Sequence, residues 1–95
     1  MAIKVIITRK VARGRQKDLL PLLTELRAKA MNQRGYISGE TLTGLSDPDE
    51  FLVISTWNSL EDWKAWDANQ ERTRIQAKID AILEAKTEAK AYMYG

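Results

Sequence analysis

Residues 36–57 of this 95-residue chain read YISGETLTGLSDPDEFLVISTW. The central SDPD, at 46–49, combines a proline with small polar residues and is a strong turn signal. The segments on either side of it contain many of the β-branched and aromatic residues that strands prefer. We therefore predict two strands, over 36–45 and 51–57, joined as a hairpin.

Upstream of this hairpin, the sequence predicts one strand followed by one helix. Residues 2–12 place β-branched side chains on one face and mixed side chains on the other, and Gly14 ends the strand. Residues 15–31 then carry leucines at helical spacing. Pro21 lies inside this segment, so we expect a local distortion of the helix. Gly35 is expected to end the helix.

A short helix with two tryptophans is expected next. Asn58 or Ser59 is its candidate cap, with an acidic residue three positions later. Trp63 and Trp66 are three residues apart and therefore lie on one face of the helix. Such a pair usually packs a helix onto a sheet, but it can also form the wall of a ligand cavity.

The end of the chain is expected to add one more helix and one more strand. A break near Asn69 precedes a helix with an apolar stripe, formed by Ile75, Ile79, Ile82 and Leu83. The alternation over 87–94 predicts a last strand. The resulting order, β-α-β-β-α-(α)-β, is a ferredoxin-like α+β arrangement with a four-stranded antiparallel sheet. We expect residues 1–95 to form a single domain.

Composition excludes several classes of protein. The chain has 15 Lys and Arg against 13 Asp and Glu, and the two signs are interleaved, unlike the basic stripe of a nucleic-acid binder. It has no cysteine and no histidine, so we expect no metal site and no Ser-His or Cys-His nucleophile within the chain. No segment approaches the ~20 apolar residues that span a bilayer. The N-terminal apolar run is too short for a signal peptide. We therefore expect a soluble cytoplasmic protein that binds neither nucleic acid nor membrane.

The predicted sheet has apolar residues on both faces. Phe51, Val53 and Trp57 fall on one face of their strand, and Leu52 and Ile54 fall on the other. Helices cover only one face of a ferredoxin-like sheet, and each large apolar side chain left exposed forgoes about 1.5–3 kcal/mol. We therefore expect a homodimer whose two sheets pack face to face. The alternative is a monomer that tolerates an apolar surface.

Several of these segments closely resemble the antibiotic biosynthesis monooxygenase family. The resemblance lies in residues 35–42 (GYISGETL), 47–48 (DP) and 51–66 (FLVISTWNSLEDWKAW), together with Arg72. It implies a dimeric α+β barrel with one cavity per subunit, between the sheet and the helices. Members of the family include cofactor-free quinol oxygenases and haem-degrading enzymes, so the resemblance specifies the fold better than the substrate.

The haem-degrading branch implies three residues: an asparagine on the first strand, a tryptophan on the middle helix and a histidine about three turns later. Trp66 matches the tryptophan. Gln76 falls near the position of the histidine ligand, and Ile7 or Thr8 falls where the asparagine would be. A glutamine amide is a poor axial ligand for iron. We therefore place haem degradation third among the interpretations.

The cofactor-free branch implies an enzyme that binds a small aromatic quinol or phenol together with dioxygen and needs no cofactor. Its site must exclude water and stabilise the substrate anion. The candidate catalytic residues are Trp66 and Asn69. The candidate substrate-binding residues are Trp63, Arg72, Gln76 and Tyr36. Any general base would have to be an Asp or Glu whose pKa is raised by burial.

A second interpretation is a non-catalytic dimeric module that binds a small apolar ligand or has only a structural role. The missing histidine modestly favours this interpretation. Four of the candidate residues also have a structural alternative: core packing for Trp63 and Trp66, a helix cap for Asn69 and one half of a surface ion pair for Arg72. Gln76 lies one turn after Arg72, so both side chains face either one pocket or solvent.

Overall fold

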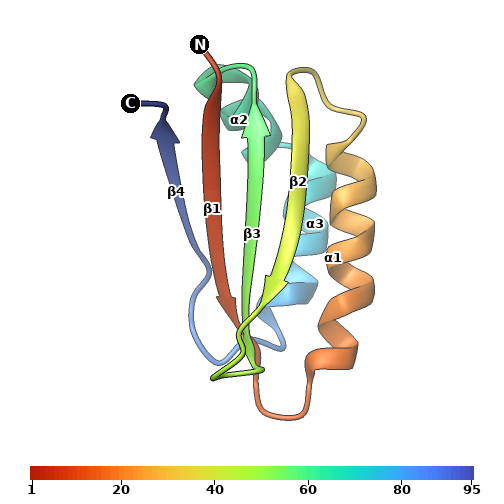
Figure 1. The fold of residues 1–95 in the computed structure, drawn as a ribbon. Coiled ribbons are helices and arrows are strands. Elements are labelled where there is room, and N and C mark those ends of the chain that lie inside the picture. Colours follow the sequence, from red (N-terminus) through yellow and green to blue (C-terminus); the bar gives the residue numbers. More distant parts are fainter.

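The structure, a computed structural model that describes residues 1–95, is a four-stranded antiparallel sheet with three helices on one face (Figure 1). In chain order the elements are β1 (Ile3–Lys10), α1 (Gln16–Ala30), β2 (Tyr36–Thr43), β3 (Glu50–Trp57), α2 (Leu60–Asp67), α3 (Gln70–Asp80) and β4 (Glu88–Met93). The strands lie in the order β2-β3-β1-β4. This confirms the predicted ferredoxin-like α+β order.

The β2–β3 hairpin forms where the sequence predicts it. The two strands pair antiparallel along their length. In the turn, the side chain of Asp47 accepts a hydrogen bond from the N–H of Asp49 at 3.1 Å. Strand β2 ends at Thr43 rather than at residue 45, because Gly44 already belongs to the turn and donates its N–H to the carbonyl of Glu50 at 2.9 Å.

Helix α1 ends earlier than predicted and continues through Pro21. The helix stops at Ala30, so Gly35 does not close it. Gly35 has a φ of +86° and leads into β2, and a Cβ there would overlap the carboxylate of Asp62. The distortion expected at Pro21 does not interrupt the helix. Both Pro21 and Lys17 are exposed, so the Lys17 carbonyl that loses its N–H partner can bind water instead.

The two later helices begin at side-chain caps. Ser59 caps α2, as predicted, by accepting a hydrogen bond from the N–H of Asp62 at 3.1 Å. Helix α3 is shorter than its predicted apolar stripe, since it ends at Asp80 and leaves Ile82 and Leu83 in the segment that follows. Leu83 instead forms an isolated antiparallel bridge with Val11, which follows the end of β1. None of the three helices is both long and apolar enough to cross a membrane.

The core lies between the helices and the covered face of the sheet. Side chains of β1 and β3 alternate between the two faces. The buried apolar residues on the covered face are Ile3, Val5, Ile7, Phe51 and Trp57. They belong to one cluster with apolar side chains of all three helices, including both tryptophans of α2. Arg9 follows in the same phase as Ile7 and is also buried.

The opposite face of the sheet carries no helix, as Figure 1 shows. At its centre Ile6 lies opposite Ile54, and Leu52 lies between Thr8 of β1 and Leu42 of β2. Leu42 is 45 % exposed. Every residue of β4 is exposed, and this strand pairs only with β1. We refer to this helix-free surface, centred on Ile6, Leu42, Leu52 and Ile54, as the open face.

Candidate functional site

A cavity lies between the helices and the covered face of the sheet. Residues from β1, β2, β3 and all three helices line it. Its apolar walls are formed by Ile7, Leu23, Leu26, Val53, Trp57, Trp63 and Trp66. The space inside it measures about 50 Å³. Small-ligand sites commonly fall between about 300 and 1,000 Å³, so the side chains that line this cavity have to move apart to admit a planar ring system.

Aromatic rings form a continuous wall on one side of this cavity. Tyr36 packs edge-on against Trp57 with ring centroids 5.3 Å apart, and Trp57 packs against Trp63 at 5.9 Å. The indole N–H of Trp57 donates to the hydroxyl of Ser55 at 3.1 Å, so the polar atom of this buried ring is satisfied. Trp66 is 3 % exposed and lines the same space. Edge-to-face packing fixes the rings relative to one another and presents apolar ring faces and edges to the cavity.

Arg72 brings a positive charge to this aromatic wall. The first turn of α3 carries it, and its guanidinium lies over the ring of Trp63, 5.3 Å from the centroid. Its Nη1 pairs with the carboxylate of Asp67 at 3.1 Å, at the solvent side of the group. The Arg72 side chain is only 8 % exposed, against 53 % for Asp67. Burial lowers the pKa of Arg72, and the charges of Asp67 and Asp80 partly oppose that effect.

Arg9 is a second buried arginine of the cavity, and it was not among the predicted site residues. Its residue exposure is 1 %. Burial and then the nearby charge of Arg72 lower the pKa of Arg9 to about 10, while Asp80 acts in the opposite direction. The group therefore stays protonated at neutral pH. The sequence contains a pattern that predicts this burial. Arg9 continues the alternation of Ile3, Val5 and Ile7, so its side chain points to the covered face of the sheet.

Gln76 holds Arg9 in place and does not line the cavity. Its carbonyl oxygen accepts a hydrogen bond from Arg9 Nη2 at 2.7 Å. Its amide nitrogen donates to Asp80 at 2.8 Å and to the hydroxyl of Thr87 at 3.1 Å. All of the polar atoms of this side chain are thus engaged by the protein. Gln76 lies behind Arg9 and links it to the carboxylate of Asp80.

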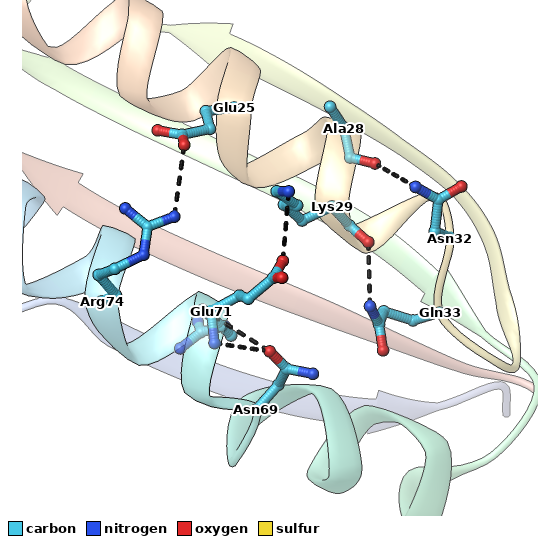
Figure 2. Close-up of polar contacts among 9 residues, drawn as sticks. Glu25, Ala28, Lys29, Asn32, Gln33, Asn69, Glu71 and Arg74 are labelled. Atoms are coloured by element: carbon cyan, nitrogen blue, oxygen red, sulfur yellow. Dashed lines mark hydrogen bonds and ion pairs between the residues drawn. The ribbon is translucent and has the colours of Figure 1, made fainter.

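Asn69 is the cap of α3, and its side chain does not line the cavity either. Its carbonyl oxygen accepts hydrogen bonds from the N–H groups of Glu71 at 2.8 Å and Arg72 at 3.4 Å (Figure 2). Figure 2 also shows ion pairs that join α1 to α3 beside this cap: Lys29 with Glu71, and Glu25 with Arg74. Asn69 contributes to the site indirectly, because it fixes the turn of helix that carries Arg72.

The structure brings together four of the six predicted site residues. Those that line the cavity are Tyr36, Trp63, Trp66 and Arg72, whereas Asn69 and Gln76 do not. At the mouth, Arg27 of α1 donates a hydrogen bond to the carbonyl of Gly39 in β2. A Cβ at Gly39 would meet the hydroxyl of Tyr36, so the glycine leaves room for that ring.

Comparison with known proteins identifies the family and the fold. A family model described as antibiotic biosynthesis monooxygenase matches residues 2–78. No curated protein matches the chain. The chain superposes on a conserved protein from Methanosarcina mazei Go1 with a TM-score of 0.93 and 17 % identity, covering 100 % of this chain and 94 % of that one.

Two other solved structures are described as oxygenases. One is an antibiotic biosynthesis monooxygenase, with a TM-score of 0.89, 20 % identity and 98 % of each chain covered. The other is SnoaB, a cofactor-independent oxygenase from Streptomyces nogalater, with a TM-score of 0.89 and 12 % identity, covering 99 % of this chain and 93 % of that one. At these identities the likeness is one of fold.

Proposed function

The chain belongs to the antibiotic biosynthesis monooxygenase family, and from this membership we propose that it is a cofactor-independent monooxygenase acting on a small aromatic quinol or phenol. The observation that carries the proposal is the cavity walled by Tyr36, Trp57, Trp63 and Trp66 between the sheet and the helices. The cofactor-independent oxygenase SnoaB has the same fold and supports it.

In the proposed reaction, dioxygen takes four electrons from the bound substrate. One oxygen atom becomes bonded to a ring carbon, which loses its hydrogen and becomes a carbonyl. The phenol oxygen loses its own hydrogen and becomes a second carbonyl, and the other atom of dioxygen leaves as water with those two hydrogens. The substrate reacts as its anion, because an anion gives up an electron more readily than the neutral phenol. The protein's tasks are to hold the ring, exclude water and stabilise negative charge.

The residues divide between these tasks. We assign Trp66 to the reacting end of the ring, with Trp63 and Tyr36 as its binding wall. Arg72 faces the same space and supplies positive charge. Asn69 and Gln76 are positioning residues in this scheme: Asn69 caps the helix turn that carries Arg72, and Gln76 holds the second arginine.

Oxygen uptake tests this proposal. Purified protein mixed with menadiol or a similar hydroquinone should consume dioxygen faster than autoxidation does, and labelled dioxygen should place one labelled atom in the product. Trp66→Phe should lower kcat/KM by about tenfold to a hundredfold, because it shortens the wall that orients the ring. Tyr94→Phe, at an exposed position, is the matched aromatic control. No uptake above autoxidation across a panel of quinols would refute the proposal.

We further propose that the working form is a homodimer that buries the open face. Ile6, Leu42, Leu52 and Ile54 form an apolar centre that no helix of the same chain covers. A second copy packed by a two-fold axis on the same surface would cover it. Light scattering at micromolar concentration should give twice the chain mass. Ile54→Lys should yield monomers, whereas Ser38→Lys at the rim of the same face should not.

A non-catalytic binding module is the second candidate. One observation favours it: the inner wall of the cavity holds arginines and aromatic rings but no buried carboxylate that could serve as a general base. Tight binding of aromatic ligands with no oxygen uptake from any quinol would support this alternative.

The residues do not fit haem as a cofactor. Gln76, which falls near the position of the haem ligand in the haem-degrading branch, is already bonded to Arg9, Asp80 and Thr87. Its side chain does not line the cavity. A haem titration should therefore produce no Soret shift typical of an axially bound haem.

A further inference from the structure

Two arginines that line the cavity have buried nitrogen atoms without a hydrogen-bond acceptor. They are Nε and Nη1 of Arg9 and Nε of Arg72. Their residues are 1 % and 7 % exposed. Nearly all buried polar groups in folded proteins have a partner, and groups on a charged side chain are the most costly to leave without one. Three such atoms at one cavity indicate a missing acceptor.

The protein's own carboxylates do not provide that acceptor. Asp67 pairs with Nη1 of Arg72 and leaves Nε free. Asp80 is separated from Arg9 by the amide of Gln76, to which it is already bonded. Arg9 has a single partner, and that partner is a neutral amide. The inner end of the cavity therefore has an excess of positive charge.

The two guanidinium groups are held in place without a ligand. Arg72 is fixed by its ion pair with Asp67 and by its contact with the face of Trp63. Arg9 is fixed by the hydrogen bond to Gln76. Groups that are already ordered bind a ligand without the entropic cost of ordering flexible side chains. This arrangement suits a fixed binding site better than a pair of mobile surface arginines.

We propose that Arg9 and Arg72 form the binding site for the negatively charged oxygen of a planar aromatic ligand, whose ring lies against the tryptophan wall. This inference rests on the proposed function, because it assumes that an aromatic substrate occupies the cavity. It restricts the proposed substrates to acidic phenols that bind as phenolates. On binding, the phenol O–H bond breaks, its electron pair stays on the oxygen, and the proton leaves to solvent through the mouth.

This site would replace the general base that the cavity lacks. Two positive charges of low exposure favour the ionised form of a bound phenol and so lower its pKa. The phenolate produced in this way is the species that the proposed reaction with dioxygen requires. The other titratable groups of the surroundings are Tyr36 and Glu40 on β2, Asp67 on α2, Asp80 on α3 and Arg27 on α1.

Binding of three naphthalenes tests the proposal at equilibrium, without turnover. The probes are 2-naphthol, 2-methoxynaphthalene, which cannot ionise, and 2-naphthoate, whose charge is on a carboxylate. The absorption of bound 2-naphthol, followed against pH, should show its pKa lowered by about one unit or more. Arg9→Met and Arg72→Met should remove this shift and weaken binding of naphtholate by about tenfold to a hundredfold. Both variants should bind 2-methoxynaphthalene at least as well as the wild type.

Two controls keep the test decisive. Arg74→Gln removes a positive charge from an exposed position of the same helix and should change none of these values. Arg9→Lys keeps the charge and should retain part of the pKa shift, so it also serves if Arg9→Met does not fold. Equal binding of 2-naphthol and 2-methoxynaphthalene in the wild type, with no pKa shift, would overturn the proposal. So would a strong preference for 2-naphthoate without a shift for naphthol.

The outcome is separable from that of the oxygen assay. A lowered naphthol pKa without any quinol oxidation would support this anion site and contradict the monooxygenase. Quinol oxidation that persists in Arg9→Met and Arg72→Met would support the monooxygenase and contradict the anion site.

Discussion

Arg72 and Arg74 lie two residues apart on α3, on opposite sides of the helix, and they differ in burial and in how completely they are paired. Arg74 faces outward, where its side chain is 51 % exposed and pairs with Glu25 of α1 at 3.6 Å. Arg72 faces the cavity, is almost fully buried and keeps one nitrogen without a partner. The outer charge joins two helices at little cost, as surface pairs do. The inner charge is costly, and we infer that it is retained for a ligand.

The same contrast separates the whole outer contact between α1 and α3 from the cavity. The outer contact has a cap, Asn69, and two ion pairs in which every charge has a partner (Figure 2). The cavity combines rigid aromatic rings with two arginines that are incompletely paired. The first arrangement stabilises the fold, whereas the two arginines of the second lower stability in exchange for binding. Removing a charge from the outer contact and removing one from the cavity should therefore change the free energy of unfolding in opposite directions.

The largest effect on stability should come from the wall of the cavity. Trp57→Ala removes a ring that is 1 % exposed and contacts both Tyr36 and Trp63. We expect the free energy of unfolding to fall by about 3–5 kcal/mol, as is usual when a buried aromatic is truncated. Urea titration followed by circular dichroism measures it. A loss below about 1 kcal/mol would mean that the wall is not rigid.

Arg9→Met should raise the free energy of unfolding, or leave it unchanged, by removing buried N–H groups that lack acceptors. We expect a gain of up to about 1–3 kcal/mol. Burial lowers the pKa of Arg9 to about 10. The free-energy cost of burying its charge is therefore fully present below pH 10 and decreases only as the pH rises above that value. The gain should therefore be constant across the neutral range. A clear loss of stability would show instead that Arg9 stabilises the fold.

Asn69→Ala tests the cap on the outer side. The substitution removes the acceptor for the N–H groups of Glu71 and Arg72 and should cost about 1 kcal/mol. Asn69→Asp, which retains an acceptor oxygen, should restore most of the loss in the same urea titration. A drop in turnover that exceeds the change in stability would reveal the positioning of Arg72 by this cap.

The smallest effect should come from Arg74→Gln. This exposed pair with Glu25 should contribute about 0–1 kcal/mol, and added salt should reduce even that. The variant is measured beside Arg9→Met at low and high ionic strength. A larger fall in the free energy of unfolding that does not depend on salt would show that this exposed ion pair contributes substantially to stability.

Sequence reasoning reached the fold more completely than the site. The hairpin over 36–57 and the cap at Ser59 depend on local chemistry, which short stretches of sequence record well. The helical spacing of the two tryptophans of α2 correctly put both rings on one buried face, but it left open whether that face was core or cavity wall, and both rings belong to the core and line the cavity.

The polar residues of the site depend on contacts that are distant in sequence. Gln76 meets Arg9 across 67 positions, so no local pattern could show that its amide is already engaged. The sequence around Asn69 would look the same if this residue capped a helix or if it contacted a substrate. Only its position relative to the cavity distinguishes the two roles. Arg9 could have been found from its strand alternation, because an arginine in phase with Val5 and Ile7 has to be buried.

A crystal structure of the protein with bound 2-naphthol would show whether the two buried arginines hold the phenolate oxygen. We predict that the naphtholate oxygen lies within about 2.7–3.2 Å of guanidinium nitrogens of both Arg9 and Arg72, with the ring against Trp63 and Trp66. An oxygen that points to the mouth, with only ordered water on the arginine N–H groups, would contradict it.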